Sequence, residues 1–251
     1  MEPQLEHRVT DSVATVVIRH PEKRNAMTAA MWRSLPPLLE GLAGDPEVRA
    51  LVLTGEGRTF CAGADISTLR GSSEEAQGLA VRAEEALAAF PKPTLAAVRG
   101  HCVGGGAQLA AACDLRFAEE GTLFGVTPAK LGIVYPASST RRLVSLVGPA
   151  TAKYLLFSGE LIDAQRALRT GLVDEVLPEG ELGKRVTEFT RLLVSRSQLT
   201  QAAAKEFADG RRDRDAHWAG QARGSGDTAE GVAAFLERRQ PRFGWSVPTS
   251  G

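Results

Sequence analysis

The sequence predicts an α/β fold. Short apolar, β-branched runs alternate with longer stretches of helical composition between residues 13 and 177. This alternation is typical of a core whose strands pair largely in parallel. One strand-like run enters a glycine triplet, Gly104–Gly106, and an alanine-rich helix begins at once. After Pro178 only helical patterns follow, so we expect the last part of the chain to be helical.

The first half of the chain carries regular strand and helix signals. Val13–Ile18 is apolar and β-branched and predicts a strand, and Thr28 is placed to cap the helix that follows. A later helical stretch stops at Pro91-Lys92-Pro93, because proline ends a helix. The expected elements are strand 13–18, helix 28–42, strand 48–54, helix 74–90, strand 94–98 and a helix from the glycine triplet to Asp114.

The second half continues this pattern and then leaves it. The expected elements are strands 115–118, 122–125 and 172–177, helices 138–146 and 149–157, a helical stretch 182–207 with a break near 195–197, a polar segment 209–215 and a helix 228–239. We therefore divide the chain into an α/β core, residues 1–194, and a C-terminal helical region, residues 195–251. The second region is too small to bury much apolar surface alone, so we expect it to pack on the core or on a neighbouring subunit.

Composition narrows the class of protein. The 251 residues are 43% hydrophobic, enough for a large core, and the 30 basic and 30 acidic residues cancel. Without a basic field we expect no nucleic-acid partner, and the longest apolar runs are too short to span a membrane. The N-terminus lacks the features of a signal peptide. Three cysteines without a CxxC spacing indicate a reducing, cytoplasmic setting, and no cluster of His, Cys, Asp or Glu has the spacing of a metal site.

Two loops of small residues carry the strongest chemical signal. The glycine triplet places backbone N–H groups at the start of a helix, where unpaired donors and the helix dipole favour negative charge. The segment Phe60–Ile66 is also rich in small residues and also follows a strand-like run. Position 108, where an acid would be useful in such a site, holds the amide of Gln108.

The ordered set of motifs resembles the enoyl-CoA hydratase/isomerase family, the crotonase superfamily. The resemblance covers nearly the whole chain, and its motifs are Arg24–Met27, Phe60–Ile66, Gly104–Asp114, Phe124-Gly125, Lys130–Ile133, Ala164–Val173 and Ala234–Arg239. It implies a crotonase-like spiral of ββα units with a C-terminal helical trimerisation region, assembled as a trimer or a dimer of trimers. It also implies a lyase whose substrate is an acyl-CoA thioester bent between the two loops. Coenzyme A enters only as part of that substrate, and no further cofactor is expected.

In that family, backbone N–H groups of the two loops form an oxyanion hole, and the matching positions here are Ala64 and Gly105. Two preorganised donors stabilise the charge that develops on the thioester oxygen as an enolate forms, and losing one costs about 3–4 kcal/mol. The alternative, that the glycines only allow close helix–strand packing, is disfavoured because both loops occur in family order. By the same resemblance, the CoA contacts fall on Arg24, Ala26, Ala62, Asp65 and Ile66. A solvated loop charge is an alternative interpretation of Arg24.

The sequence departs from the hydratase pattern at both catalytic glutamates. In the family these acids activate water and carry the Cα proton, and the matching positions here hold Gln108 and Pro128. An amide cannot exchange protons at neutral pH, and proline has no side-chain acid. Because each positioned acid or base is worth about 10²–10⁴-fold, we expect weak hydration unless another group substitutes.

Tyr135 is the candidate substitute. A subset of the family that decarboxylates short malonyl-type CoA thioesters has a tyrosine in a similar Leu-Gly-x-x-Tyr context, matched here by Leu131–Tyr135. That reaction needs no base, since loss of CO2 leaves the electron pair on Cα and the oxyanion hole holds the enolate. Tyr135 would orient the departing carboxylate, with Gln108 or water nearby. A packed aromatic whose hydroxyl bonds to backbone is the competing interpretation, and an acyl-CoA-binding protein without catalysis is a third function.

Other candidates are interpreted as structural. We expect His101 to be a hydrogen-bonded core residue, Cys61 to be a buried inert thiol, and Asp65 to fix its loop by accepting hydrogen bonds. Phe243 is expected to anchor the C-terminal region, the alternative being that it closes a neighbour's CoA pocket.

Overall fold

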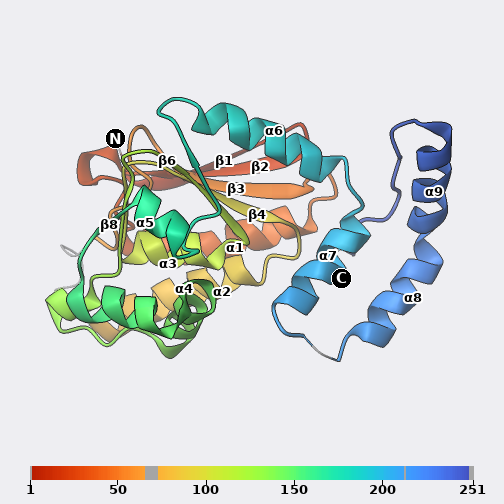
Figure 1. Ribbon diagram of the computed structural model, residues 1–251. Helices are drawn as coiled ribbons and strands as arrows, with labels where there is room; N and C mark the ends of the chain where they lie inside the picture. The colour runs from red at the N-terminus through yellow and green to blue at the C-terminus, as the bar shows by residue number, and fades with distance from the viewer. Residues whose placement is uncertain (1, 66–72, 212, 249–251) are drawn as a thin grey trace.

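The computed structural model describes residues 2–65, 73–211 and 213–248, and it confirms the α/β core (Figure 1). Within these residues the main sheet has six strands in the order β1-β2-β3-β4-β6-β9. Every neighbouring pair is parallel except β1 and β2, which form an antiparallel hairpin. The strands are β1 (Gln4–Thr10), β2 (Val13–Arg19), β3 (Ala50–Gly55), β4 (Thr94–Val98), β6 (Leu115–Glu119) and β9 (Glu175–Leu177).

A smaller sheet stands beside the main one and positions the glycine triplet. It contains β5 (His101–Val103), β7 (Leu123–Gly125) and β8 (Ile162–Asp163) in the order β5-β7-β8. Strand β5 pairs in parallel with β7 and leads directly into α3 (Gly105–Ala112). An isolated bridge between Cys61 and Cys102 joins β5 to the loop that follows β3. The second sheet thus brings the two small-residue loops together.

Helices cover both faces of the main sheet (Figure 1). Alternate residues of the central strands point to opposite faces, so Leu51 and Leu53 join the large core on one face while Val52 joins a smaller core under α6. Burial on both faces explains why these strands read as continuous apolar runs. The helices of the core are α1 (Ala29–Gly44), α2 (Ser73–Ala88), α3, α4 (Ala137–Ser158), α5 (Ala164–Arg169) and α6 (Leu182–Val194), and a 3-10 turn spans Pro128–Leu131.

The C-terminal helices α7 (Gln198–Ala208), α8 (Asp215–Ser225) and α9 (Asp227–Glu237) lie at one side of the core (Figure 1). They have their own small apolar cluster, centred on Leu199, Ala202 and Trp218. Lys205 of α7 ties them to the core, because its Nζ lies 2.9 Å from Asp114 Oδ2. The division at residue 194 coincides with the end of α6, and a separate oligomerisation role for residues 195–251 stays a prediction. No helix in the described ranges is both long and apolar enough to cross a membrane.

Several expected boundaries are confirmed and others are wrong. Thr28 caps α1 by accepting a hydrogen bond from Met31 N, and the break near 195–197 separates α6 from α7. The two helices expected at 138–146 and 149–157 are confirmed, because α4 is broken at Gly148, whose φ of 73° and ψ of 163° are not helical. The strand expected at 172–177 is only β9, since the N–H groups of Leu172 and Val173 bond to Ala167 O at the end of α5. Strands β1, β5 and β8 and helices α5 and α8 were not expected.

Candidate active site

The loop after β3 is fixed by backbone hydrogen bonds on two sides. Met27 N donates to Gly63 O at 2.8 Å, and Asp65 N donates to Met27 O at 2.8 Å, which binds the loop to the segment before α1. On the other side, Cys61 N donates to His101 O at 2.9 Å. These bonds place the loop against β5 and the start of α3. Its backbone is therefore held in one conformation before any ligand arrives.

Two backbone donors face each other where the loops meet. A Cβ atom on Gly105 would lie 3.4 Å from Ala64 N, so the two residues are in contact distance. Neither the Ala64 N–H nor the Gly105 N–H has an acceptor among the residues that the structure describes. Both residues are partly exposed, so an oxygen of a ligand can reach them. Two adjacent N–H groups without a protein acceptor are therefore available to an external acceptor such as a ligand oxygen or water.

The glycine triplet also meets steric demands. Gly104 has φ 55° and ψ −116°, which L side chains rarely adopt. A Cβ on Gly106 would lie 2.2 Å from Cys61 O, so only glycine lets α3 approach the other loop. Gly106 is therefore explained by close packing of α3 against this loop. Gly105 differs, since a Cβ there would meet the ring of Trp32 at 2.9 Å as its nearest neighbour, and this position supplies the free donor.

The residues matched to CoA binding lie along the same loops. Asp65 is 7% exposed, and Lys23 Nζ lies 2.8 and 3.1 Å from its two carboxylate oxygens, so this side chain helps to fix the loop. The Arg24 side chain is exposed and has no ion pair within the described ranges, while its carbonyl accepts a hydrogen bond from Ala62 N at 3.0 Å. Ala26 is buried beside them. Ile66 lies outside the described residues.

Gln108 belongs to a buried polar cluster that the sequence did not reveal. Its Nε2 donates to Glu84 Oε2 at 2.5 Å and to Ser139 Oγ at 3.1 Å. Ser139 Oγ donates to the same Glu84 oxygen, and Arg142 forms an ion pair with the other Glu84 oxygen. Glu84 itself is fully buried, at 0% exposure. Helical spacing could have indicated it, since Glu84 follows buried Ala83 and precedes buried Leu87 on one face of α2.

Tyr135 lines a groove beside this cluster. The groove has a volume of about 580 Å³ and runs between α2 and the segment before α4, with Gln77, Val81, Val134 and Pro136 among its other lining residues. The Tyr135 ring packs against the large core, as the competing interpretation expects, but within the described ranges its hydroxyl has no hydrogen-bond partner. Burial raises the pKa of the phenol above its ordinary value, with Cys102 as a further contribution, so Tyr135 is a neutral donor at physiological pH. Pro128 begins the 3-10 turn and offers no acid.

The remaining candidates are structural. Burial raises the pKa of the Cys61 thiol to about 12, and the side chain lies 3.4 Å from Gly63 N, so it is a protonated packing residue. His101 uses its carbonyl to hold the Cys61 N–H. The Phe243 ring packs against Gly231 of α9 in its own chain.

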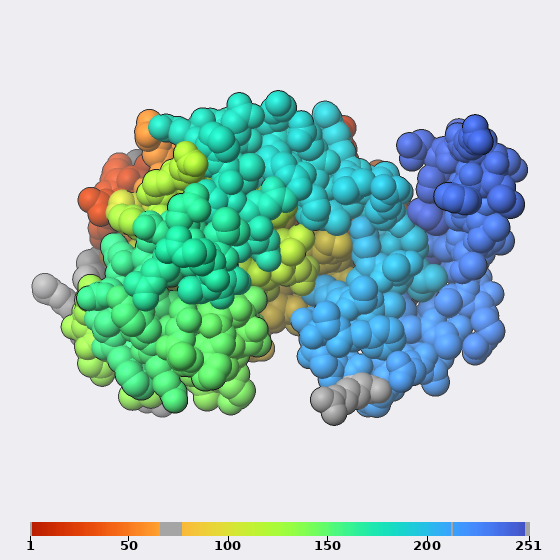
Figure 2. All heavy atoms as spheres, viewed as in Figure 1, coloured from red at the N-terminus to blue at the C-terminus, as the bar shows by residue number. Residues whose placement is uncertain are grey.

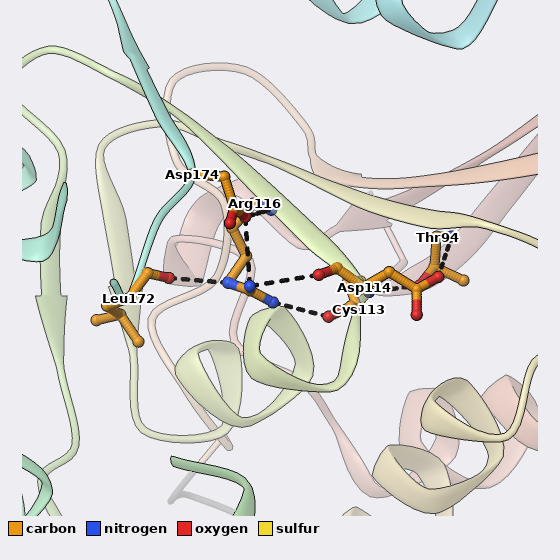
Figure 3. A network of polar contacts seen from close by, with 6 residues as sticks. All are labelled: Thr94, Cys113, Asp114, Arg116, Leu172 and Asp174. Carbon is orange, nitrogen blue, oxygen red and sulfur yellow. Dashed lines mark hydrogen bonds and ion pairs between the residues drawn. The ribbon is translucent and has the colours of Figure 1, made fainter. Parts of the chain in front are cut away.

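The far end of α3 is held by buried Arg116 (Figure 3). Its guanidinium donates to the backbone oxygens of Leu172 and Cys113 at 2.8 and 2.7 Å, and to the Asp174 carboxylate at 3.3 Å. Next to it, Asp114 accepts hydrogen bonds from the backbone and hydroxyl of Thr94. These contacts anchor the C-terminal end of α3, opposite the glycine triplet.

A larger hollow, about 940 Å³, lies between the core and α7 and is visible between α4 and the C-terminal helices in Figure 2. Arg141, Arg142, Lys205 and Arg211 give it a cationic lining, alongside Glu85, Asp114 and Asp209. Ala64 and Gly105 line neither this hollow nor the Tyr135 groove. The free N–H groups of Ala64 and Gly105 therefore lie outside both of these hollows.

The two sheets, the covering helices and the adjoining loops define a crotonase-fold protein. The chain belongs to the enoyl-CoA hydratase/isomerase family, whose sequence profile matches residues 8–245. A putative enoyl-CoA hydratase of Thermus thermophilus is 38% identical over 92% of this chain and 97% of its own length. The crotonyl-CoA hydratase of Syntrophomonas wolfei is 34% identical, covering 93% and 95%.

Solved structures agree. A crystal structure of an enoyl-CoA hydratase/isomerase family member matches with a TM-score of 0.91 and 38% identity, over 98% of this chain and all of that chain. A family protein from Hyphomonas neptunium matches with a TM-score of 0.90 and 34% identity, over 96% and 98%. The family acts on CoA thioesters, which confirms the predicted substrate class at the level of the family.

Proposed function

We propose that this protein is a lyase that binds an acyl-CoA thioester and stabilises its enolate between the N–H groups of Ala64 and Gly105. The observation that carries the proposal is the pair of adjacent backbone donors without acceptors. When the thioester becomes an enolate, negative charge builds on its oxygen, and two donors already in place stabilise that charge without reorganisation. The small residues of both loops allow the thioester to approach the backbone closely.

The remaining assignments follow from family membership. Arg24, Ala26, Ala62, Asp65 and Ile66 are proposed to contact the CoA moiety, with the exposed Arg24 guanidinium suited to a phosphate. A homotrimer or dimer of trimers is proposed, supported by the exposed apolar side chains of α9, namely Val232, Phe235 and Leu236. A cytoplasmic location stays a prediction from the free cysteines.

Ordinary hydration is expected to be weak. Gln108 and Pro128 stand where the family's hydratases have acids, and neither can activate water or carry a proton. The only carboxylate in contact with Gln108 among the described residues is Glu84, which is fully buried. It cannot reach a bound acyl group in this arrangement.

Decarboxylation of a short malonyl-type CoA thioester is the second candidate, favoured by the unpartnered hydroxyl of Tyr135. The bond between Cα and the carboxylate carbon breaks, CO2 leaves, and the electron pair moves through Cα to the thioester oxygen held by the two N–H groups. The enolate then takes a proton from water at Cα. Tyr135 would donate a hydrogen bond that orients the carboxylate before it leaves.

The test is a pair of thioester assays with a binding control. Loss of the conjugated absorbance of crotonyl-CoA reports hydration, and chromatographic conversion of methylmalonyl-CoA to the propionyl thioester reports decarboxylation. We expect turnover of at least one of them, and Tyr135→Phe should slow decarboxylation by about tenfold or more if the hydroxyl orients the carboxylate. Equal rates for Tyr135→Phe and wild type would remove Tyr135 from the reaction. Calorimetric binding of butyryl-CoA without turnover of a broad thioester panel would favour the third function, binding without catalysis.

A further inference from the structure

One of the three tryptophans has an indole N–H without a hydrogen-bond partner. Trp32 is only 2% exposed, and its Nε1 has no acceptor among the residues that the structure describes. The other two indoles are satisfied, since Trp218 Nε1 donates to Glu206 Oε2 at 2.7 Å. Likewise Trp245 Nε1 donates to Gln221 Oε1 at 3.0 Å. Buried polar groups are nearly always hydrogen-bonded, and one that is left unpaired is a candidate for a role in binding or catalysis.

The Trp32 ring lies against the two free backbone donors. A Cβ built on Gly105 would have Trp32 Cζ2 as its nearest neighbour, at 2.9 Å, and would lie 3.4 Å from Ala64 N. The Gly105 nitrogen is bonded to the same Cα that would carry this Cβ. Within the indole, Nε1 is bonded to the ring carbon next to Cζ2, so the N–H and the Cζ2–H project from one edge of the ring. That edge is the one that faces Gly105.

The ring and the loop that carries Ala64 are held by one backbone network. Met27 N donates to Gly63 O and Met27 O accepts from Asp65 N, both at 2.8 Å, so these bonds flank Ala64 on both sides. Helix α1 follows, and it carries Trp32 in its first turn. The position of the indole relative to the free backbone donors is therefore fixed by the fold.

A third donor at this place suits an enolate better than a neutral thioester. A carbonyl oxygen has two lone pairs, which the N–H groups of Ala64 and Gly105 can satisfy. When the thioester becomes an enolate, its oxygen takes up negative charge and can accept a further hydrogen bond. Hydrogen bonds to an ionised acceptor are stronger than those to a neutral one. A donor that acts only at this stage stabilises the intermediate without tightening the binding of the substrate.

We propose that Trp32 is a further donor of this site, whose Nε1–H hydrogen-bonds to the thioester oxygen once that oxygen carries the enolate charge. The inference rests on the proposed function. In the ligand-free protein this N–H is sealed from solvent. A small turn of the ring brings it to the acceptor, and the hydrogen bond gained there favours the turned position.

The experiment removes the N–H and keeps the ring. Replacing Trp32 with 3-benzothienylalanine exchanges the N–H for sulfur in a ring of nearly the same shape. Two ligands are compared, acetoacetyl-CoA, which ionises to an enolate with near-ultraviolet absorbance, and butyryl-CoA, which stays neutral. We expect the affinity for the enolate to fall about tenfold or more and the affinity for butyryl-CoA to change less than about threefold. Trp245→Phe is the matched control, because it removes an indole that is already bonded, and both affinities should stay within about twofold of wild type.

The indole N–H resonances give a second measurement on the unaltered protein. Isotope-labelled protein shows one such resonance for each tryptophan, and Trp32→Phe and Trp245→Phe assign them. Acetoacetyl-CoA should move the Trp32 resonance downfield, because its N–H gains an acceptor. The resonances of Trp218 and Trp245 should stay in place, since their N–H groups are already bonded.

The outcomes separate this inference from the proposed function. Wild-type affinity for the enolate in the benzothienylalanine protein overturns the inference, and so does a Trp32 resonance that acetoacetyl-CoA leaves unmoved. An equal loss for both ligands also overturns it, because a packing role would affect both. If any of these results is found while Gly105→Pro still raises the pKa of bound acetoacetyl-CoA, the proposed function stands without Trp32. If wild type binds neither ligand, the proposed thioester site is wrong and the inference falls with it.

Discussion

Replacing Gly105 with proline tests the free N–H at the start of α3 directly. Proline lacks the N–H but is well accepted at the first position of a helix, which is where Gly105 stands. Any added Cβ would lie 2.9 Å from the Trp32 ring and force it to shift. Gly105→Ala is therefore the matched control, since it adds the same Cβ and keeps the donor.

The magnitude follows from the charge that the donor stabilises. Loss of one preorganised oxyanion donor costs about 3–4 kcal/mol. Since one pKa unit corresponds to about 1.36 kcal/mol, a bound thioester that ionises to its enolate should have its pKa raised by roughly 2–3 units in the proline variant relative to the alanine variant. The effect needs no catalytic base and no assumption about the reaction.

Acetoacetyl-CoA provides the assay, because its enolate absorbs in the near ultraviolet. Titrating the ligand at saturating protein gives the pKa of the bound thioester for wild type, Gly105→Ala and Gly105→Pro. We expect the first two values to agree closely and the third to be higher. Equal values for the two variants would refute the assignment of Gly105 N–H as an oxyanion donor. A large rise in both would show that the Trp32 contact, and not the donor, shapes the site.

Three further predictions concern the support of the site. Arg116→Met removes a buried guanidinium that satisfies carbonyl oxygens at the end of α3, so the free energy of unfolding in urea should fall by about 3–5 kcal/mol. Arg58→Met breaks an exposed ion pair and should change it by less than about 1 kcal/mol, and similar losses in both variants would contradict the role given to Arg116. Burial raises the pKa of Cys61 to about 12 from its ordinary value of 9.0, so the native protein should resist alkylation near pH 8 and become labelled only on unfolding. The raised pKa also means that the folded state holds this proton more tightly, so stability should fall as pH rises from 9.0 toward 12, and Cys61→Ala should reduce that slope.

The sequence predicts the centre of the main sheet well because the central strands β3 and β4 are buried on both faces. Strands β3 and β4 are continuous apolar runs, and the alternation of strands with helices predicts their parallel pairing. Strand β1 escapes prediction because it is an exposed edge strand with a polar sequence, joined to β2 by Asp11 and Ser12, both with positive φ. Helix α8 has two glycines and buries only Trp218, so no periodic apolar face marks it, and packing in the C-terminal region decides it.

The candidate site also contains some features that the sequence indicates and others that only the structure reveals. The assignment of Ala64 and Gly105 as backbone donors follows from the family resemblance of two short motifs, and their role stays a prediction. The CoA contacts and the oligomer stay predictions. Glu84, Ser139 and Arg142 could not be assigned from the sequence, because α2 and α4 bring them to Gln108 from 24, 31 and 34 residues away. A helical pattern can indicate that Glu84 is buried, but it cannot name its partners.

The amide at position 108 therefore has to be considered together with the rest of its cluster, Glu84, Ser139 and Arg142. A glutamate at 108 would bring a second carboxylate to within hydrogen-bond distance of Glu84, which lies 2.5 Å from the present amide nitrogen. Two carboxylates so close cannot both ionise, and the pKa of one is strongly raised. Gln108→Glu alone would thus give a shared proton instead of a free general base. The amide at 108 and the buried carboxylate at 84 are complementary, and a hydratase-like acid at 108 requires that residue 84 give up its charge.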